Sequence, residues 1–246
     1  MKEPSGDWVY GAHSVRNVLD AAPARVRRVW VAAGRRSETL GDLIAQAKAL
    51  GIRVESVDRR QLDRVALGPH QGVAAQCHAV APATEAELER RWPDFENPFV
   101  LVLDQVQDPR NLGACLRAAE AAGVDAVLVP KRHAAGLTSA AIRTSSGAFE
   151  HLFVVSVTNL ARRLSWLKEQ GVWVVGGHQD AGTSLYDLEM PAPTAVVVGG
   201  EGRGLRRLTA QQCDHLVRIP MAGEVASLNV AVAAGILLFE VVRTRQ

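Results

Sequence analysis

The fold is decided by residues 196–230, which read VVVGGEGRGLRRLTAQQCDHLVRIPMAGEVASLNV. Two apolar runs, 194–198 and 215–219, have the length and composition of strands, and each stops at a loop rich in glycine and polar residues. Ligands of open parallel sheets bind at loops that follow the carboxyl ends of strands. Glycines let the backbone approach a ligand closely. This stretch therefore predicts a parallel α/β sheet with a small-molecule site at one edge.

Common nucleotide-binding motifs are absent from these loops. A G-x-G-x-x-G motif that begins at Gly200 would need its third glycine at Leu205, and no G-K-[ST] sequence occurs. Ser227 is a suitable N-cap for a following helix. Residues 230–239 are all apolar or glycine, which predicts a helix buried all round, in the core, in a subunit interface or in both.

Length and composition predict two domains in a cytoplasmic protein. The chain has 246 residues, 48% of them hydrophobic, and its first 15 residues are too polar for a signal peptide or membrane anchor. Cys77, Cys115 and Cys213 are isolated and form no C-x-x-C pair, so we expect neither disulfides nor a bound metal. No stretch is long and apolar enough to span a membrane.

The first 80 residues predict a small α/β sandwich. Strands are expected at 8–10, 26–32, 52–57 and 72–78, and helices at 15–21, 37–50 and 60–67. This part holds 12 Lys and Arg against 8 Asp and Glu, which favours RNA binding. Histidines 13 and 70 lie beside glycines and are expected to be solvated loop residues. Residues 81–98 contain three prolines and an acidic cluster, so they are interpreted as a linker with one helical turn at 85–91.

Residues 99–246 predict a parallel sheet covered on both faces by helices. The strands are expected at 99–103, 124–129, 152–157, 172–175, 195–198 and 216–219. The intervening helices are expected at 112–122, 159–170 and 205–212. Arg117 is a cation in the otherwise apolar, alanine-rich segment LGACLRAAEAAG, which makes it a candidate functional residue. The alternative is a purely structural role, as an i,i+3 pair with Glu120 on a solvated face.

Three ordered motifs resemble those of the SpoU-type RNA ribose methyltransferases of the SPOUT superfamily. They are Asn111-x-Gly113-x-x-x-Arg117, the glycine-rich segment 199–204, and Ile219-Pro220-Met221 followed by Ser227-Leu228-Asn229. YGAHSV and HQGVAAQ resemble the ribosomal-protein-like RNA-binding domain of one branch, which methylates the ribose 2′-oxygen of a guanosine in 23S ribosomal RNA. The resemblance implies a 1–80 RNA substrate-binding domain, an 81–98 linker and a 99–246 SPOUT methyltransferase domain. It also implies a C-terminal trefoil knot, bound S-adenosyl-L-methionine and a homodimer.

The resemblance also implies roles for individual residues. The expected cofactor-binding residues are Gly199, Gly200, Gly202, Ile219, Met221, Ser227 and Leu228. The expected catalytic residues are Asn111, Arg117, Glu201 and Asn229. The expected RNA-binding residues are His13, Arg16, Arg110 and Arg143, the last at a position where the family has lysine.

The chemistry constrains what Arg117 could do. A ribose hydroxyl is a weak nucleophile unless its proton is accepted or its developing charge is stabilised. A guanidinium group keeps its proton in proteins, so Arg117 is expected to hold a phosphate or stabilise the alkoxide, with Glu201 orienting it. The alternatives are methylation of another ribosomal or transfer RNA nucleotide and a non-catalytic RNA-binding protein of the same fold. A nucleotide-dependent oxidoreductase is disfavoured because its fingerprint is missing.

Overall fold

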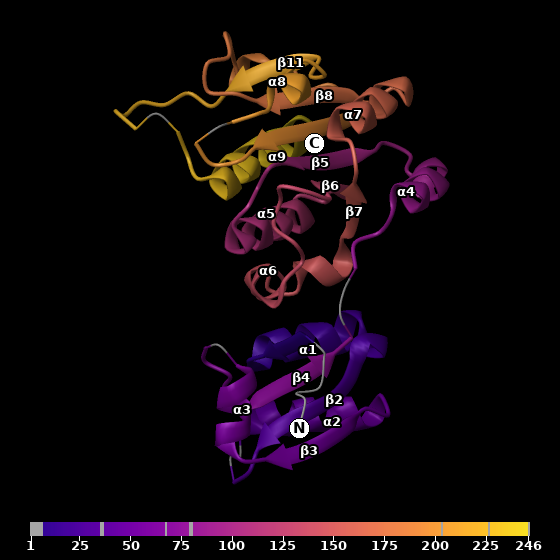
Figure 1. Cartoon of the computed structure of the whole chain (residues 1–246), viewed down its shortest axis with the longest axis vertical. Helices are drawn as coiled ribbons and strands as arrows, with labels where there is room; N and C mark the ends of the chain where they lie inside the picture. The colour runs from indigo at the N-terminus through magenta and orange to yellow at the C-terminus, as the bar shows by residue number, and fades with distance from the viewer. Residues whose placement is uncertain are drawn as a thin grey trace. The chain divides into compact units, whose positions relative to one another are not determined.

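The alternation of helices and strands produces two sheets in the computed structural model (Figure 1). The structure describes residues 7–34, 37–66, 68–78, 81–202, 204–225 and 227–245. The chain divides into two units, Met1–Ala81 and Pro82–Gln246. Each unit is considered by itself below.

The N-terminal unit is a four-stranded mixed sheet with helices packed on it. Its strands are β1 (Asp7–Tyr10), β2 (Val26–Ala32), β3 (Arg53–Val57) and β4 (Val73–Cys77), in the order β1-β4-β2-β3. Its helices are α1 (Ala12–Ala21), α2 (Glu38–Ala49) and α3 (Arg59–Val65). Only β2 and β3 run parallel; β4 is antiparallel to both β1 and β2. The expected sandwich is present, although Leu67, the predicted end of the third helix, lies outside the described residues.

Local sequence signals explain where these elements start and stop. Ser37 caps α2 by accepting a hydrogen bond from the backbone N–H of Leu40, and Gly51 ends the helix with a φ of 71°. One prediction is wrong. His70 is buried, with Nε2 3.0 Å from Asp63 Oδ1 and Nδ1 accepting from the N–H of Gly72, because this ring braces the turn before β4.

The C-terminal unit contains a seven-stranded sheet in which every pairing is parallel. Its strands are β5 (Phe99–Asp104), β6 (Ala126–Pro130), β7 (Phe153–Val157), β8 (Trp173–Gly177), β9 (Thr183–Ser184), β10 (Thr194–Gly199) and β11 (His215–Arg218). Their order is β7-β6-β5-β10-β8-β11-β9. The late strand β10 therefore lies between two strands that precede it in the chain.

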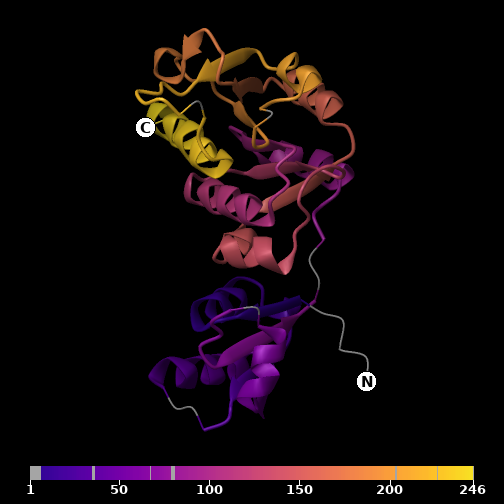
Figure 2. The ribbon, with the colours of Figure 1, turned by 60° about the vertical axis from the view of Figure 1, so that its left-hand side comes forward.

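Helices cover both faces of this sheet, as the apolar strands require. They are α4 (Glu85–Arg91), α5 (Pro109–Ala121), α6 (Ser139–Thr144), α7 (Leu160–Glu169), α8 (Arg207–Ala210) and α9 (Val230–Arg245). Alternate strand residues such as Val100 and Val102 form one buried cluster with Leu164 and Leu167 of α7. Helix α5 packs against both α6 and α9, as the two views agree (Figures 1 and 2). The predicted fold class is confirmed, whereas the knot stays a prediction.

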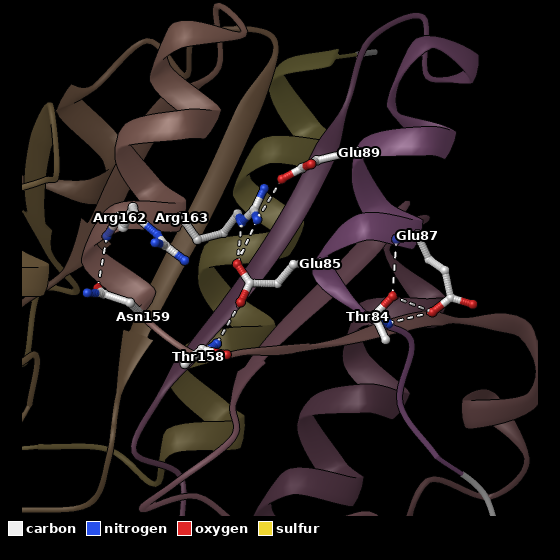
Figure 3. A network of polar contacts seen from close by, with 8 residues as sticks. All are labelled: Thr84, Glu85, Glu87, Glu89, Thr158, Asn159, Arg162 and Arg163. Carbon is white, nitrogen blue, oxygen red and sulfur yellow. Dashed lines mark hydrogen bonds and ion pairs between the residues drawn. The ribbon is translucent and has the colours of Figure 1, made fainter.

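The segment 81–98 differs from the expected linker. Its helical turn lies at Glu85–Arg91 as predicted, but Leu88 and Trp92 are buried in the core of the C-terminal unit. Glu85 also accepts hydrogen bonds from Arg163 of α7 and from the N–H of Thr158 (Figure 3). Two large apolar residues and one buried ion pair are enough to fold most of this segment onto the sheet.

Helix α9 is less enclosed than its sequence predicts. Val230, Ala234, Leu237 and Leu238 are buried, but Val232 is 50% and Phe239 49% exposed. Part of this apolar helix is thus uncovered in the single chain. Among the described residues, no helix is long and apolar enough to cross a membrane.

Candidate active site and cofactor pocket

A pocket lies at the carboxyl edge of the C-terminal sheet, where β8, β10 and β11 end and α9 begins. The space between its walls, including space open to solvent, amounts to about 840 Å³. Its walls include apolar side chains such as Val198, Val217 and Leu237. All seven predicted cofactor residues line it: Gly199, Gly200, Gly202, Ile219, Met221, Ser227 and Leu228.

The glycine-rich loop after β10 is folded tightly on itself. A Cβ atom at Gly199 would collide with the backbone of Gly204 and Leu205, and one at Gly200 would collide with the carbonyl oxygen of Gln105. Gly204 donates its N–H to the carbonyl of Gly200 at 3.1 Å, which closes the loop. The first two glycines are therefore required by the protein's own backbone.

Gly202 has a different reason to be glycine. Its φ is 73°, a left-handed conformation that costs other residues energy, and a Cβ there would meet no protein atom within 4 Å. The tightest protein contacts in the loop are thus at Gly199 and Gly200, not at Gly202.

A buried ion pair holds the segment that follows this loop. Asp104, at the end of β5, is fully buried and is paired in register with Gly199 of β10. Its carboxylate accepts hydrogen bonds from the backbone N–H of Arg206 at 2.9 Å and from its Nε at 2.6 Å. A buried carboxylate needs such partners, so Asp104 ties the end of the glycine loop to the centre of the sheet.

Three of the four predicted catalytic residues form one chain of hydrogen bonds. Asn111, in the first turn of α5, donates from Nδ2 to Oε1 of Glu201. Its Oδ1 accepts a hydrogen bond of 3.0 Å from Nδ2 of Asn229. The three residues lie 90 and 118 positions apart in the chain. They meet because α5, the glycine loop and the start of α9 all lie at the carboxyl edge.

Asn229 is also the cap of α9, a role the sequence assigns to Ser227. The helix begins at Val230, and Oδ1 of Asn229 accepts the N–H of Ala231 at 2.9 Å. Ser227 lies two residues before this cap and lines the pocket instead. The prediction failed because both residues suit an N-cap and an apolar run alone does not fix its first helical residue.

Arg117 stands apart from these three residues. It is exposed on α5, and its Nη1 lies 3.4 Å from Oγ of Ser146, which follows α6. Within the described ranges Arg117 forms no ion pair with Glu120. The i,i+3 pair that was the alternative explanation for this arginine is therefore absent. Glu201 contacts Asn111, not Arg117, in the single chain. The expectation that Glu201 orients Arg117 is therefore not met here.

The four predicted RNA-binding residues lie in two places. His13 and Arg16 of α1 line a surface groove of the N-terminal unit together with Glu38 and Asp42. Arg16 is 3.8 Å from the carboxylate of Asp42, so its charge is partly balanced. In the C-terminal unit, Arg110 is exposed in the first turn of α5, and Arg143 lies in α6, which packs on α5.

Gly113 serves packing, not a ligand. A Cβ atom at this position would collide with the carbonyl oxygen of Ala141 and lie 2.7 Å from Cβ of Thr144. The small residue lets α5 and α6 approach closely, so its place in the first motif has a structural cause.

Two thiols of the C-terminal unit, the buried Cys115 and the half-buried Cys213, are unreactive at neutral pH. Burial, together with the negative charge of Glu201, raises the pKa of Cys115 to about 12. Burial is also the main cause that raises the pKa of Cys213 to about 12. A thiol reacts as its thiolate, so neither cysteine is suited to act as a nucleophile at neutral pH.

Sequence reasoning missed the contribution of β8. Gly177, the last residue of this strand, lines the pocket together with His178 and Gln179, which follow it. They lie within GGHQD at 176–180, and the rule that sites follow the carboxyl ends of parallel strands could have found them. The glycine-rich loops drew attention because they are unusual in composition, and this segment is less so.

Comparison with known proteins accounts for both units. The sequence profile of the SpoU rRNA Methylase family matches residues 98–239. The chain belongs to the SpoU rRNA methylase family. A second profile, described as RNA 2′-O ribose methyltransferase substrate binding, matches residues 8–83. The two matches cover nearly all of both units.

Named relatives of this SpoU chain extend over its full length. It is 46% identical over 243 residues to the 23S rRNA (guanosine-2′-O-)-methyltransferase RlmB of Photobacterium profundum, covering 98% of this chain and 99% of that one. The RlmB of Yersinia pestis is 47% identical over 238 residues, or 96% and 97% of the two chains.

A solved SpoU structure has the same fold. The SpoU methyltransferase AviRb from Streptomyces viridochromogenes, in complex with the cofactor AdoMet, superposes with a TM-score of 0.80 at 25% identity. The match covers 97% of this chain and 90% of that chain. The superposition extends over both units of the SpoU chain, so the chain shares its fold with a solved relative.

Proposed function

We propose that this protein transfers a methyl group from S-adenosyl-L-methionine to the ribose 2′-oxygen of a guanosine in 23S ribosomal RNA. One observation supports the proposal most: the seven residues expected to bind the cofactor line one pocket, and Glu201 of that pocket belongs to the hydrogen-bonded set that it forms with Asn111 and Asn229. The RlmB relatives, which match over nearly the whole chain, carry this activity in their names.

The residues of the pocket fit a nucleoside with a charged amino-acid tail. Apolar walls such as Val217 and Leu228 suit a purine ring, and the exposed backbone of Gly202 and Gly204 suits the polar groups of a ribose. Glu201 supplies a negative charge for an ammonium or sulfonium group. S-adenosyl-L-methionine would supply the activated methyl group there.

The protein's own groups would position the reactants. Asn111 and Asn229 fix the carboxylate of Glu201 through their hydrogen bonds, and methyl transfer depends mainly on such positioning. Arg117 would hold a phosphate of the target nucleotide or stabilise the charge that develops on the 2′-oxygen. Among the described residues that line the pocket, His178 and Glu201 can exchange a proton.

A homodimer in the cytoplasm, with the N-terminal unit binding RNA, completes the proposal. Val232 and Phe239 of α9 and Met221 near the pocket are large apolar residues that the single chain leaves exposed. A second copy would cover such residues. Ribosomal RNA is made in the cytoplasm of bacteria, the source of the named relatives.

The decisive experiment uses 23S ribosomal RNA transcribed in vitro, which lacks all modification. The protein and S-adenosyl-L-methionine are added, and ribose methylation is mapped by resistance to alkaline cleavage. Methylation of one guanosine is expected. Transfer to a base, or to transfer RNA alone, would replace the proposed substrate. No transfer by a folded protein that binds the RNA would favour the non-catalytic alternative.

A further inference from the structure

Two exposed cations begin the loop that joins β6 to α6. Lys131 and Arg132, here called the β6 cation pair, directly follow Pro130 in the sequence PKRHAAG. Neither forms an ion pair with any residue that the structure describes. No motif of the sequence analysis includes them, and neither lines the pocket.

The register of the sheet places the β6 cation pair at the edge that carries the active site. Val102 of β5 is paired with Leu128 of β6, so Lys131 is level with Gln105. On the other side of β5, Asp104 is paired with Gly199, so Gln105 is also level with Gly200. The carboxyl ends of β6 and β10 are thus two strand spacings, or about 10 Å, apart, and the loops that follow them hold Lys131 and the glycines.

The backbone holds the base of this loop in place. The N–H of Lys131 bonds to the carbonyl of Val157 at 2.8 Å, and the N–H of Ala135 bonds to that of Val106 at 2.7 Å. His133 makes the turn between them with a φ of 59°. Binding a ligand here would therefore cost less conformational entropy of the protein than binding the same ligand to cations on a free loop.

The surrounding charges leave this edge positive. Arg110 and Arg117 on α5 are exposed cations that form no ion pair within the described residues. The nearby acids are used within the protein: Asp108 caps α5 through the N–H of Arg110, and Glu201 accepts from Asn111. The two carboxylates keep their charge and offset Arg110 and Arg117, so the β6 cation pair is what makes the sum of these charges positive.

We propose that the β6 cation pair binds backbone phosphates of the RNA strand beside the nucleotide being methylated. The inference rests on the proposed function, which places the target ribose at the same edge. Phosphate is favoured over base recognition because the pair carries two positive charges, and the one aromatic ring in residues 131–138 is that of His133, which makes the turn of the loop. Lysine and arginine together suit a phosphate, as a point charge and a bidentate fork.

The test compares the full-length protein with a double variant, Lys131→Ala with Arg132→Ala. Binding of unmodified 23S transcript is measured against salt concentration without cofactor, and methylation is measured with saturating S-adenosyl-L-methionine. Loss of two single-strand phosphate contacts should lower the slope of log K against log salt by about 1.4. KM for RNA should rise several-fold, while kcat and cofactor affinity stay unchanged. The exchange Lys131→Arg with Arg132→Lys should restore the slope.

The matched control removes one lysine and one arginine elsewhere on the same unit, Lys168→Ala with Arg90→Ala. These residues lie in the last turns of α7 and α4 and carry the same total charge. The control should keep the wild-type salt slope. An unchanged slope in the β6 variant, or an equal loss in the control, would overturn the proposal. A wild-type protein that binds RNA but does not methylate it would refute the proposed function. The salt slopes of the β6 variant and the control would still show whether the β6 cation pair binds phosphates.

Discussion

Asn229 both caps α9 and donates a hydrogen bond of 3.0 Å to Asn111. One side chain therefore couples the start of the C-terminal helix to the start of α5, and through Asn111 to Glu201. The Asn111 amide turns its donor Nδ2 to Glu201 and its acceptor Oδ1 to Asn229, and a flipped amide would place Oδ1 against the carboxylate of Glu201. Replacement of Asn229 by a carboxylate thus breaks the chain whichever way Asn111 turns.

Asn229→Asp should separate the two roles of this residue. Aspartate still caps the helix, so the melting temperature should stay near the wild-type value. Loss of the donor to Asn111 should slow methylation, by about 1–3 kcal/mol of activation free energy if the bond persists in the transition state. Asn229→Ala should also lose the cap, at about 1 kcal/mol of folding stability. Full activity in Asn229→Asp would show that Glu201 needs no such orientation.

Gly199→Ala should destabilise the protein before any cofactor is added. The new methyl group would collide with the backbone of Gly204 and Leu205, so the loop would have to open. Gly202→Ala is the matched control, because its methyl group meets only open space and the positive φ costs about 1–2 kcal/mol. Thermal unfolding of the apo proteins should place Gly199→Ala well below Gly202→Ala. Equal melting temperatures would contradict the tight-loop geometry.

Arg117→Ala should slow turnover strongly and leave folding intact. The side chain is exposed, and within the part of the chain that the structure describes it makes one hydrogen bond, 3.4 Å long, to Ser146. Loss of one preorganised donor costs roughly 10²- to 10³-fold in rate, whereas Glu120→Ala should be silent. Single-turnover assays from pH 6 to 10 should show the same pH dependence for Arg117→Lys and wild type. A rate that climbs as the new lysine deprotonates would instead make residue 117 a base.

The stability of the C-terminal unit should fall in acid through Glu85. Burial disfavours the charged carboxylate, but hydrogen bonds from Thr158 and Arg163 outweigh it and lower the pKa of Glu85 below 4.5 (Figure 3). A carboxyl group whose pKa is lower in the folded state than in the unfolded state stabilises the fold at pH values above its unfolded-state pKa. This contribution to stability is lost as the pH falls through the folded-state pKa. Unfolding in urea between pH 6 and 3 should show this loss, and Glu85→Gln should remove part of the pH dependence. An identical profile for Glu85→Gln would refute the assignment.

The strands could be predicted from the sequence because each is a short apolar run with sharp polar ends. The sequence also indicated two segments of the pocket, because they are rich in glycine and polar residues. They are the loop at 199–204 and the segment 219–229. The order of the strands was not, since an apolar run does not reveal which neighbours it pairs with. Helix α6 was missed because its six residues are too few to show a helical period. Leu88 and Trp92 were too few to distinguish a folded segment from a linker.

The position of β10 affects how the chain can fold during synthesis. Both of its neighbours, β5 and β8, leave the ribosome first, so for a time each presents an unpaired edge. Open edges of apolar strands invite pairing with other chains. Until residues 194–199 arrive, only β7, β6 and β5 can pair, and β8 has neither of its partners because β11 is made later still. We expect this interval to be the stage of its production most prone to aggregation, and the one that chaperones protect.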